Sequence, residues 1–236
     1  LKEHRLAARE IIPPELKLFN HLKRVQLEWP ANRDERMSWS EVAIRMTGNQ
    51  SALCVVNTKQ AALDLFADLK LRSQNVFHLS TSLCPTHRTV VLDAVKKRLE
   101  AKQNVHVVST QLIEAGVDID FPCVLREMAP LESIIQAAGR CNREGRIAEA
   151  GGRVVVFRSM EGKIPKGWYK LGRDVLETIL ANGSRPSIDR PEDVRAYFHE
   201  LYWKRSLDPQ NIVGLRAGLR FATVAEHYRL IDDDTV

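Results

Sequence analysis

Short apolar runs alternate with segments of helical periodicity along the middle of the chain. The apolar runs lie at residues 53–56, 76–79, 105–108, 123–128 and 153–157. Each run has the length of a buried strand, and the stretches between them place apolar residues three and four positions apart, as amphipathic helices do. Strands that alternate with such helices predict βαβ units, a mainly parallel sheet and right-handed crossovers. The pattern therefore predicts an α/β fold.

The segments on either side of this alternation have weaker patterns. Residues 22–29 alternate apolar and basic positions, which favours a strand, and a short helix then begins at Ser38 or Ser40 and ends at Gly48. After Ser159 the pattern predicts helices. We divide the chain into a linking or edge segment, an α/β domain and a small helical accessory segment, at residues 1–50, 51–160 and 161–236.

Composition and charge permit binding to nucleic acid without demanding it. The chain carries 35 basic and 30 acidic residues, a formal net charge of +5, and an ordinary protein of slightly high pI is equally consistent with this excess. No apolar run is long enough to span a bilayer. The four cysteines show no C-x-x-C spacing, which argues against a zinc site and for reduced thiols in the cytoplasm.

Polar residues follow two of the predicted strands. Thr110 ends the run at 105–108 and opens a predicted helix, which Gly116 ends before a tight loop that contains Asp118. A second helix begins at Pro130 and is predicted to continue through the residues Gln136, Gly139, Arg140 and Arg143. Because ligands of open α/β sheets bind past the carboxyl ends of the strands, we expect all these groups at that one edge.

Arg140 and Arg143 are three positions apart, so on a helix they would share a face. Two guanidinium groups on one face suit a phosphate, because the planar fork of each can donate two hydrogen bonds to its oxygens. The alternative is a solvated basic helix end, which is what most arginine pairs are.

Two stretches of this region resemble a known family. The sequences STQLIEAGVDIDF and QAAGRCNREGR resemble motifs V and VI of superfamily 2 helicases. The particular residues within these motifs resemble those of the CRISPR-associated helicase–nuclease of type I interference systems. The resemblance covers residues 53–157. It implies a RecA-like fold for this region, the second of two such motor domains, with residues 1–50 linking it to the first.

The resemblance also implies roles at a nucleotide between the two motor domains. Arg143 matches the arginine finger, which in phosphoryl-transfer enzymes contributes roughly 10³–10⁵ in rate, and Arg140 matches its neighbour on the phosphates. Gln136 matches the glutamine that opens motif VI. Gly116 and Asp118 match motif V positions near the ribose and phosphates, where glycine allows close backbone approach and a carboxylate accepts from hydroxyls. The alternative for Asp118 is a turn residue that caps its own loop.

Four further residues match positions that contact the tracked nucleic-acid strand. Thr110 is implied to bind a strand phosphate, and as the alternative it only caps the helix that follows; both roles are compatible. Asn57 and Thr58 occupy the motif IV position, and Arg88 ends the segment after it. Contacts to phosphate carry no sequence specificity.

Other motifs of the family are absent from these 236 residues. There is no G-x-x-x-x-G-K-[ST] cradle, no D-E-x-[HD] run and no adjacent His-Asp pair of the kind the nuclease domain uses. ATP and Mg²⁺ would thus be bound mainly by the first motor domain, and we expect no metal site here and no ATP hydrolysis by this chain alone. Its first residues, LKEHRLAARE, lack a starting Met and a signal peptide, so we expect a fragment of a larger protein.

The leading hypothesis is the second motor domain of an ATP-dependent helicase that moves on single-stranded DNA and feeds it to a nuclease domain in CRISPR interference. Its expected partners are single-stranded DNA, the first RecA-like domain and an RNA-guided surveillance complex; no membrane is expected. Two alternatives stay open: another superfamily 2 motor acting on RNA or duplex DNA, and a non-catalytic nucleic-acid-binding or regulatory module of the same fold.

Overall fold

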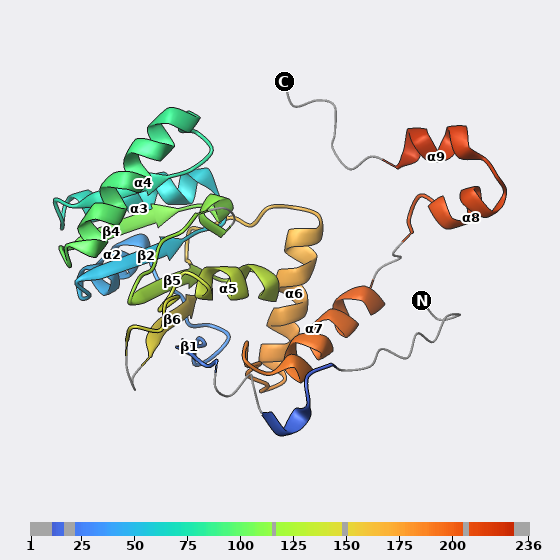
Figure 1. The fold of residues 1–236 in the computed structure, drawn as a ribbon, viewed down its shortest axis with the longest axis horizontal. Coiled ribbons are helices and arrows are strands. Elements are labelled where there is room, and N and C mark those ends of the chain that lie inside the picture. Colours follow the sequence, from blue (N-terminus) through green and yellow to red (C-terminus); the bar gives the residue numbers. More distant parts are fainter. Residues whose placement is uncertain (1–10, 17–21, 115–116, 148–150, 205–207, 229–236) are drawn as a thin grey trace. The chain divides into compact units, whose positions relative to one another are not determined.

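A computed structural model describes residues 11–16, 22–114, 117–147, 151–204 and 208–228 of the chain (Figure 1). They fall into two compact units, Leu1–Tyr197 and Phe198–Val236. The first unit contains the whole sheet together with segments that the sequence had separated at residues 50 and 160. Within the described ranges, no helix has both the length and the apolar character that a membrane span requires.

The first unit is built on a six-stranded sheet with the order β1-β6-β5-β2-β4-β3. Every pairing between neighbouring strands is parallel. The predicted α/β class with a mainly parallel sheet is confirmed, and residues 22–29 supply an edge strand of that sheet. The strands are β1 (Val25–Glu28), β2 (Ser51–Val55), β3 (Val76–Leu79), β4 (Val105–Ser109), β5 (Cys123–Glu127) and β6 (Gly152–Phe157).

One face of the sheet is covered by helices α2 (Trp39–Thr47) and α3 (Lys59–Lys70). A capping box begins α2: Ser38 accepts a hydrogen bond from the Glu41 amide, and the Glu41 carboxylate accepts one from the Ser38 amide. Apolar side chains of these helices pack on alternate residues of the strands, because successive strand residues face opposite sides. In β2 the residues on this face are Ala52 and Cys54.

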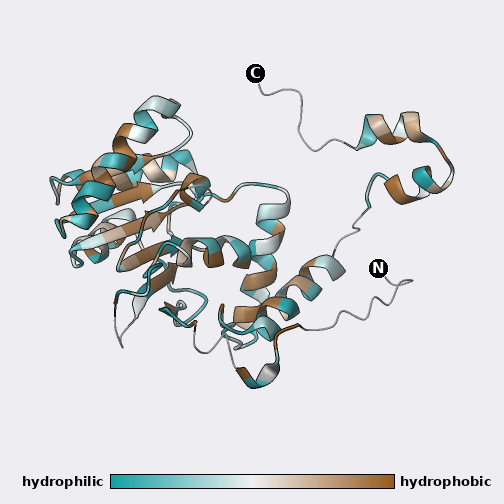
Figure 2. Ribbon diagram, in the orientation of Figure 1, coloured by the Kyte–Doolittle hydropathy of each residue, from teal (hydrophilic) through white to brown (hydrophobic). Residues whose placement is uncertain are grey.

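The opposite face is covered by α4 (Pro85–Glu100), the 3₁₀ helix η2 (Gln111–Glu114) and α5 (Leu131–Ala138). In β2 this face takes the other alternate residues, Leu53 and Val55. Hydrophobic residues accordingly concentrate in the strands, between two layers of helices (Figure 2). The predicted helix after Thr110 is present only as the short η2.

The remaining helices follow the sheet. Helix α6 (Trp168–Ala181) buries Val175, Leu176 and Leu180. Helix α7 (Pro191–Trp203) begins in the first unit and ends in the second. The second unit also contains α8 (Ile212–Ala217) and α9 (Phe221–His227), and a 3₁₀ turn, η1 (Pro14–Leu16), lies near the start of the chain. A helical C-terminal extension was predicted, and it is present.

Gly152 offers a test of this packing, because β6 starts directly against the turn that follows α5. A Cβ atom at Gly152 would overlap Cys141 Sγ and come within 2.9 Å of Asn142 Cβ. We expect Gly152→Ala to lower the free energy of unfolding by about 1–3 kcal/mol, as overpacked substitutions do. Urea denaturation measures this change.

The matched control is Gly48→Ala. Gly48 has a φ of −68°, and a Cβ there would meet its nearest atoms at 3.6 Å. We expect its unfolding free energy to stay the same or rise by up to about 1 kcal/mol. Equal effects of the two substitutions would contradict the close contact at Gly152.

Candidate nucleotide and nucleic-acid site

The predicted site residues lie at two edges of the sheet instead of one. Thr110 follows the carboxyl end of β4, where its amide donates to the Leu79 carbonyl at 3.2 Å. Arg140 lies beside the amino end of β5, because its carbonyl accepts from the Phe121 amide at 2.9 Å. The expectation of a single edge is wrong. Helix α5 returns the chain along the length of β5, so the residues after it reach the opposite edge.

Arg140 and Arg143 also do not share a helix face, because α5 ends at Ala138. The chain turns there. The backbones of Cys141 and Phe121 form an isolated parallel β-bridge, and the next residue, Asn142, is buried with a φ of +46°. Asn142 fixes the turn by donating from its side-chain amide to the Arg24 carbonyl at 2.8 Å. Both arginines therefore belong to a turn.

Arg140 is anchored to η2. Its Nε donates to the Ile113 carbonyl at 2.9 Å and its Nη2 to the Glu114 carbonyl at 2.6 Å. These carbonyls end a helix and have no partner within it, so a cation is favourable there. Burial, and then the neighbouring charge of Arg143, lowers the pKa of Arg140 from its ordinary value, yet the group remains protonated.

Arg143 has a fixed backbone and an exposed side chain. Its amide donates to Asp120 Oδ1 at 2.8 Å, and its carbonyl accepts from the Arg24 guanidinium. Its Nη1 lies 2.7 Å from Asp118 Oδ1, and the two side chains are 43% and 74% exposed. An ion pair so exposed contributes only about 0–1 kcal/mol. The guanidinium is therefore free to exchange Asp118 for another anion.

Asp120 caps the turn that follows α5, which is a different role from the capping of its own loop considered for Asp118. Both carboxylate oxygens of Asp120 accept from the turn after α5, one from the Arg143 amide and the other from the Glu144 amide at 3.3 Å. Asp120 was not among the predicted site residues, although it lies two residues from Asp118. Gln136 lies exposed on α5, and Gly116 lies outside the described residues.

The predicted strand-contact residues differ in how free their side chains are. Asn57 is buried, its amide nitrogen donates to the Met128 carbonyl at 2.9 Å, and its Oδ1 accepts from Arg126 and Tyr169. The Asn57 amide is thus used inside the protein. A direct nucleic-acid contact by this side chain would have to break those bonds.

The other three predicted contacts lie near the carboxyl edge. Thr58 caps α3, since its hydroxyl accepts from the Ala61 amide at 3.1 Å. Thr110 is 6% exposed. Arg88, half-buried on α4, lines a hollow of about 290 Å³ together with Leu92 and Ile113. Arg88 therefore lies across this hollow from η2, the helix that directly follows Thr110.

A buried arginine that was not among the predicted site residues joins these segments. Arg126 has no exposed surface. Its Nη1 donates to the Val55 carbonyl at 3.1 Å, and its Nη2 lies 2.5 Å from Tyr169 Oη and 3.2 Å from Glu114 Oε1. One guanidinium therefore holds the end of β2, helix η2 and helix α6. The available signal was an Arg-Glu pair inside an otherwise apolar strand.

Two carboxylates complete this buried network. Glu114 is 6% exposed in its side chain, and burial raises its pKa, a shift that Arg126 opposes. The Glu127 carboxylate accepts hydrogen bonds from the backbone amide of Asn57 at 2.8 Å and from Ser159 Oγ at 2.5 Å. Burial raises the pKa of Glu127 as well. The network thus joins the ends of β2, β5 and β6.

Known proteins are similar to the region that contains Arg140 and Arg143. Residues 48–146, which contain the turn with both arginines, match the family described as CRISPR-associated nuclease/helicase Cas3, C-terminal. The matched residues are thus similar to the C-terminal part of Cas3 proteins. A Cas3 nuclease/helicase from Haloferax volcanii is 57% identical over 51 residues, which is 22% of this chain and 5% of that protein. One from Methanothermobacter thermautotrophicus is 29% identical over 133 residues, 56% of this chain and 16% of that protein.

Solved structures agree with the fold. A crystal structure of T. fusca Cas3 with AMPPNP has a TM-score of 0.60 and 18% identity, and covers 86% of this chain and 27% of its own. A structure of a CRISPR RNA-guided surveillance complex, pre-nicking, has a TM-score of 0.53 and 20% identity, with 89% and 29% covered. The chain thus shares the RecA-like fold of these structures. It spans only a small part of the length of the relatives that it matches.

The Arg126–Glu114 pair gives a prediction about stability. Arg126→Met leaves a buried carboxylate without its cation, which typically costs about 3–5 kcal/mol. We expect a loss of this size in the free energy of unfolding, measured by urea denaturation. The matched control is Arg153→Met, because Arg153 pairs with Glu28 at 2.8 Å on the surface and should cost at most about 1 kcal/mol. A loss below about 1 kcal/mol for Arg126→Met would contradict the structural role of Arg126.

Proposed function

We propose that this chain is the second motor domain of an ATP-dependent translocase that moves on single-stranded DNA and delivers the unwound strand to a nuclease domain in CRISPR interference. ATP and Mg²⁺ would be held mainly by a first RecA-like domain of the same protein. A recruiting RNA-guided surveillance complex is part of the proposal, and the shared fold with a structure of such a complex supports it.

The observation that carries the proposal is the contrast between the two arginines. Arg140 is fixed to the carbonyls of η2, whereas the only side-chain partner found for Arg143 among the described residues is the exposed Asp118. A γ-phosphate carries more negative charge than one carboxylate and offers more acceptor oxygens. Arg143 would exchange Asp118 for these oxygens and stabilise the charge that develops as the phosphoryl group is transferred.

The segment 110–121 supports a link between strand binding and nucleotide binding. It begins at Thr110, at the carboxyl edge of the sheet, and reaches Asp118 and Asp120, which contact Arg143 near the other edge. Arg140 binds this segment midway, at η2. A nucleotide that draws Arg143 away from Asp118 would thus act on the same segment that holds Thr110.

The test is ATP hydrolysis by a polypeptide that joins this chain to a first motor domain, with and without single-stranded DNA. We expect Arg143→Ala to lower DNA-stimulated hydrolysis by roughly 10³-fold or more, the usual contribution of an arginine finger. Arg146→Ala is the control, because the side chain of Arg146 is 77% exposed and its ion pair is with the nearby Glu144. It should leave the rate within about twofold of wild type, since it removes no phosphate contact.

Each other outcome has a definite meaning. Unchanged hydrolysis in a folded Arg143→Ala protein would show that the finger assignment is wrong. Absence of DNA stimulation in the wild type would favour the non-catalytic binding module instead. We also propose that the 236 residues alone do not hydrolyse ATP, because their sequence contains no phosphate cradle.

A further inference from the structure

A hollow of about 440 Å³ lies past the carboxyl ends of β1 and β6, against α6. It is lined by the loop residues Arg33 and Arg36, by Arg158 after β6, and by Arg173, Asp174 and Glu177 of α6. We propose that this hollow is a binding site for a phosphate group. It is separate from Arg143, which lies near the start of β5, so the proposal does not depend on the nucleotide site.

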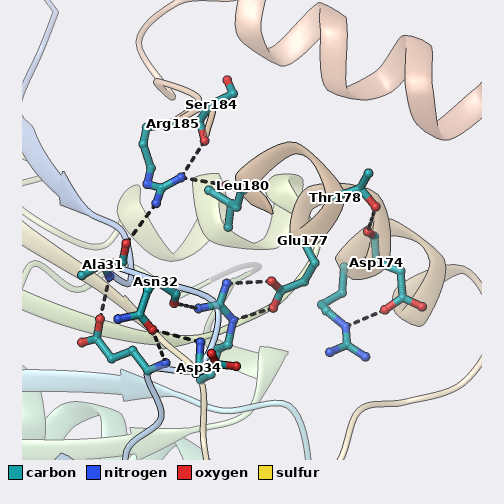
Figure 3. Close-up of polar contacts among 12 residues, drawn as sticks. Ala31, Asn32, Asp34, Asp174, Glu177, Thr178, Leu180, Ser184 and Arg185 are labelled. Atoms are coloured by element: carbon teal, nitrogen blue, oxygen red, sulfur yellow. Dashed lines mark hydrogen bonds and ion pairs between the residues drawn. The ribbon is translucent and has the colours of Figure 1, made fainter. Parts of the chain in front are cut away.

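The floor of the hollow is a satisfied ion pair. Arg158 Nε and Nη2 donate to the two carboxylate oxygens of Glu177 at 2.8 and 2.7 Å, and Nη1 donates to the Asn32 carbonyl at 2.9 Å. Arg158 is 7% exposed. The ion pair neutralises Glu177, and the bonds of Arg158 to Glu177 and to Asn32 join α6 to the loop that follows β1. Figure 3 labels Glu177 and Asn32 at the ends of these bonds.

The loop above the floor is held in one conformation. Asn32 Oδ1 accepts from the amides of Asp34 and Glu35 at 3.0 and 2.8 Å, and the Glu35 carboxylate accepts from the Ala31 amide at 2.6 Å. Arg185 Nη2 donates to the Ala31 carbonyl at 3.3 Å (Figure 3). Arg33 and Arg36 therefore extend from a fixed backbone, which reduces the entropy that binding would cost.

The charges that remain in the hollow are positive. Arg173 Nε lies 2.9 Å from Asp174 Oδ1, which leaves its two Nη groups available. Arg33 and Arg36 show no hydrogen bond or ion pair with any described residue, and neither Asp34 nor Glu35 lines the hollow. The four guanidinium groups thus exceed the two carboxylates by two charges, which matches a phosphate dianion, and their planar forks suit its oxygens.

The phosphate group has two possible sources with the same chemistry. It is either a small phosphorylated molecule, for which the volume lies within the usual range of ligand pockets, or one phosphodiester of a nucleic-acid strand. Inorganic phosphate probes the first source and a twelve-residue thymidine oligonucleotide the second. Both are titrated into the 236-residue chain at constant ionic strength, with chloride as the balancing anion.

The test compares Arg33→Gln/Arg36→Gln with the control Lys97→Gln/Arg195→Gln, which removes the same charge from exposed positions outside the hollow. Phosphate binding is followed by the NMR signals of the arginine Nε–H groups, and oligonucleotide binding by fluorescence anisotropy. We expect the hollow variant to bind at least one probe about tenfold more weakly than the control, because it loses charge-assisted hydrogen bonds.

A loss with phosphate would identify a small-molecule source, and a loss with the oligonucleotide alone would identify the strand; either supports the site. Equal binding of both probes by the hollow variant and the control would overturn it, as would no binding of either probe by the wild type. Both double variants keep Arg143, so any phosphate bound at that residue contributes equally to both, and failure here is distinct from failure of the proposed function. Neither double variant should lose folding stability, because neither loses an observed bond of the hollow.

Discussion

The structure of the site depends on one buried charge, the Arg126 guanidinium. An arginine in a protein stays protonated, and a fully buried cation is tolerated only when it is bonded on several sides. Arg126 meets this requirement by binding the Val55 carbonyl, Tyr169 Oη and the Glu114 carboxylate. The end of β2, helix α6 and helix η2 must therefore lie around it. Since η2 follows Thr110 directly, one ion pair fixes the start of the segment that connects the two candidate binding regions.

Arg140 and Arg143 extend this arrangement to the other edge of the sheet. Arg126 binds the Glu114 side chain and Arg140 binds the Glu114 carbonyl, both at the end of η2. The position of η2 therefore also fixes the turn after α5. Within that turn the backbone of Arg143 is fixed by Asp120, whereas its side chain rests on an exposed carboxylate. The backbone of Arg143 is thus fixed while its guanidinium can move. This combination suits a group that binds a phosphate only when a partner domain supplies one.

The sequence predicted the sheet well because strands and helices are local patterns. The predicted strands at 76–79, 105–108 and 153–157 match the observed ones to within one residue, since each is an apolar run bounded by polar residues. The placement of the site was harder. The single-edge expectation failed because α5 is only long enough to cross β5 and is followed by a turn. The role of Asn57 in the core arises from partners at Arg126, Met128 and Tyr169, and no local pattern shows contacts so distant in sequence.

Amide hydrogen exchange of the native protein tests most directly whether Arg126 positions the connecting segment. Exchange at Ile113, whose amide donates to the Thr110 carbonyl, is compared between wild type and Arg126→Met, with Val107 of β4 as the internal reference. Local opening makes exchange faster where structure is lost and leaves other elements protected. We predict faster exchange at Ile113 relative to Val107 in the variant. An unchanged ratio of the two exchange rates would contradict the role of Arg126 in holding η2.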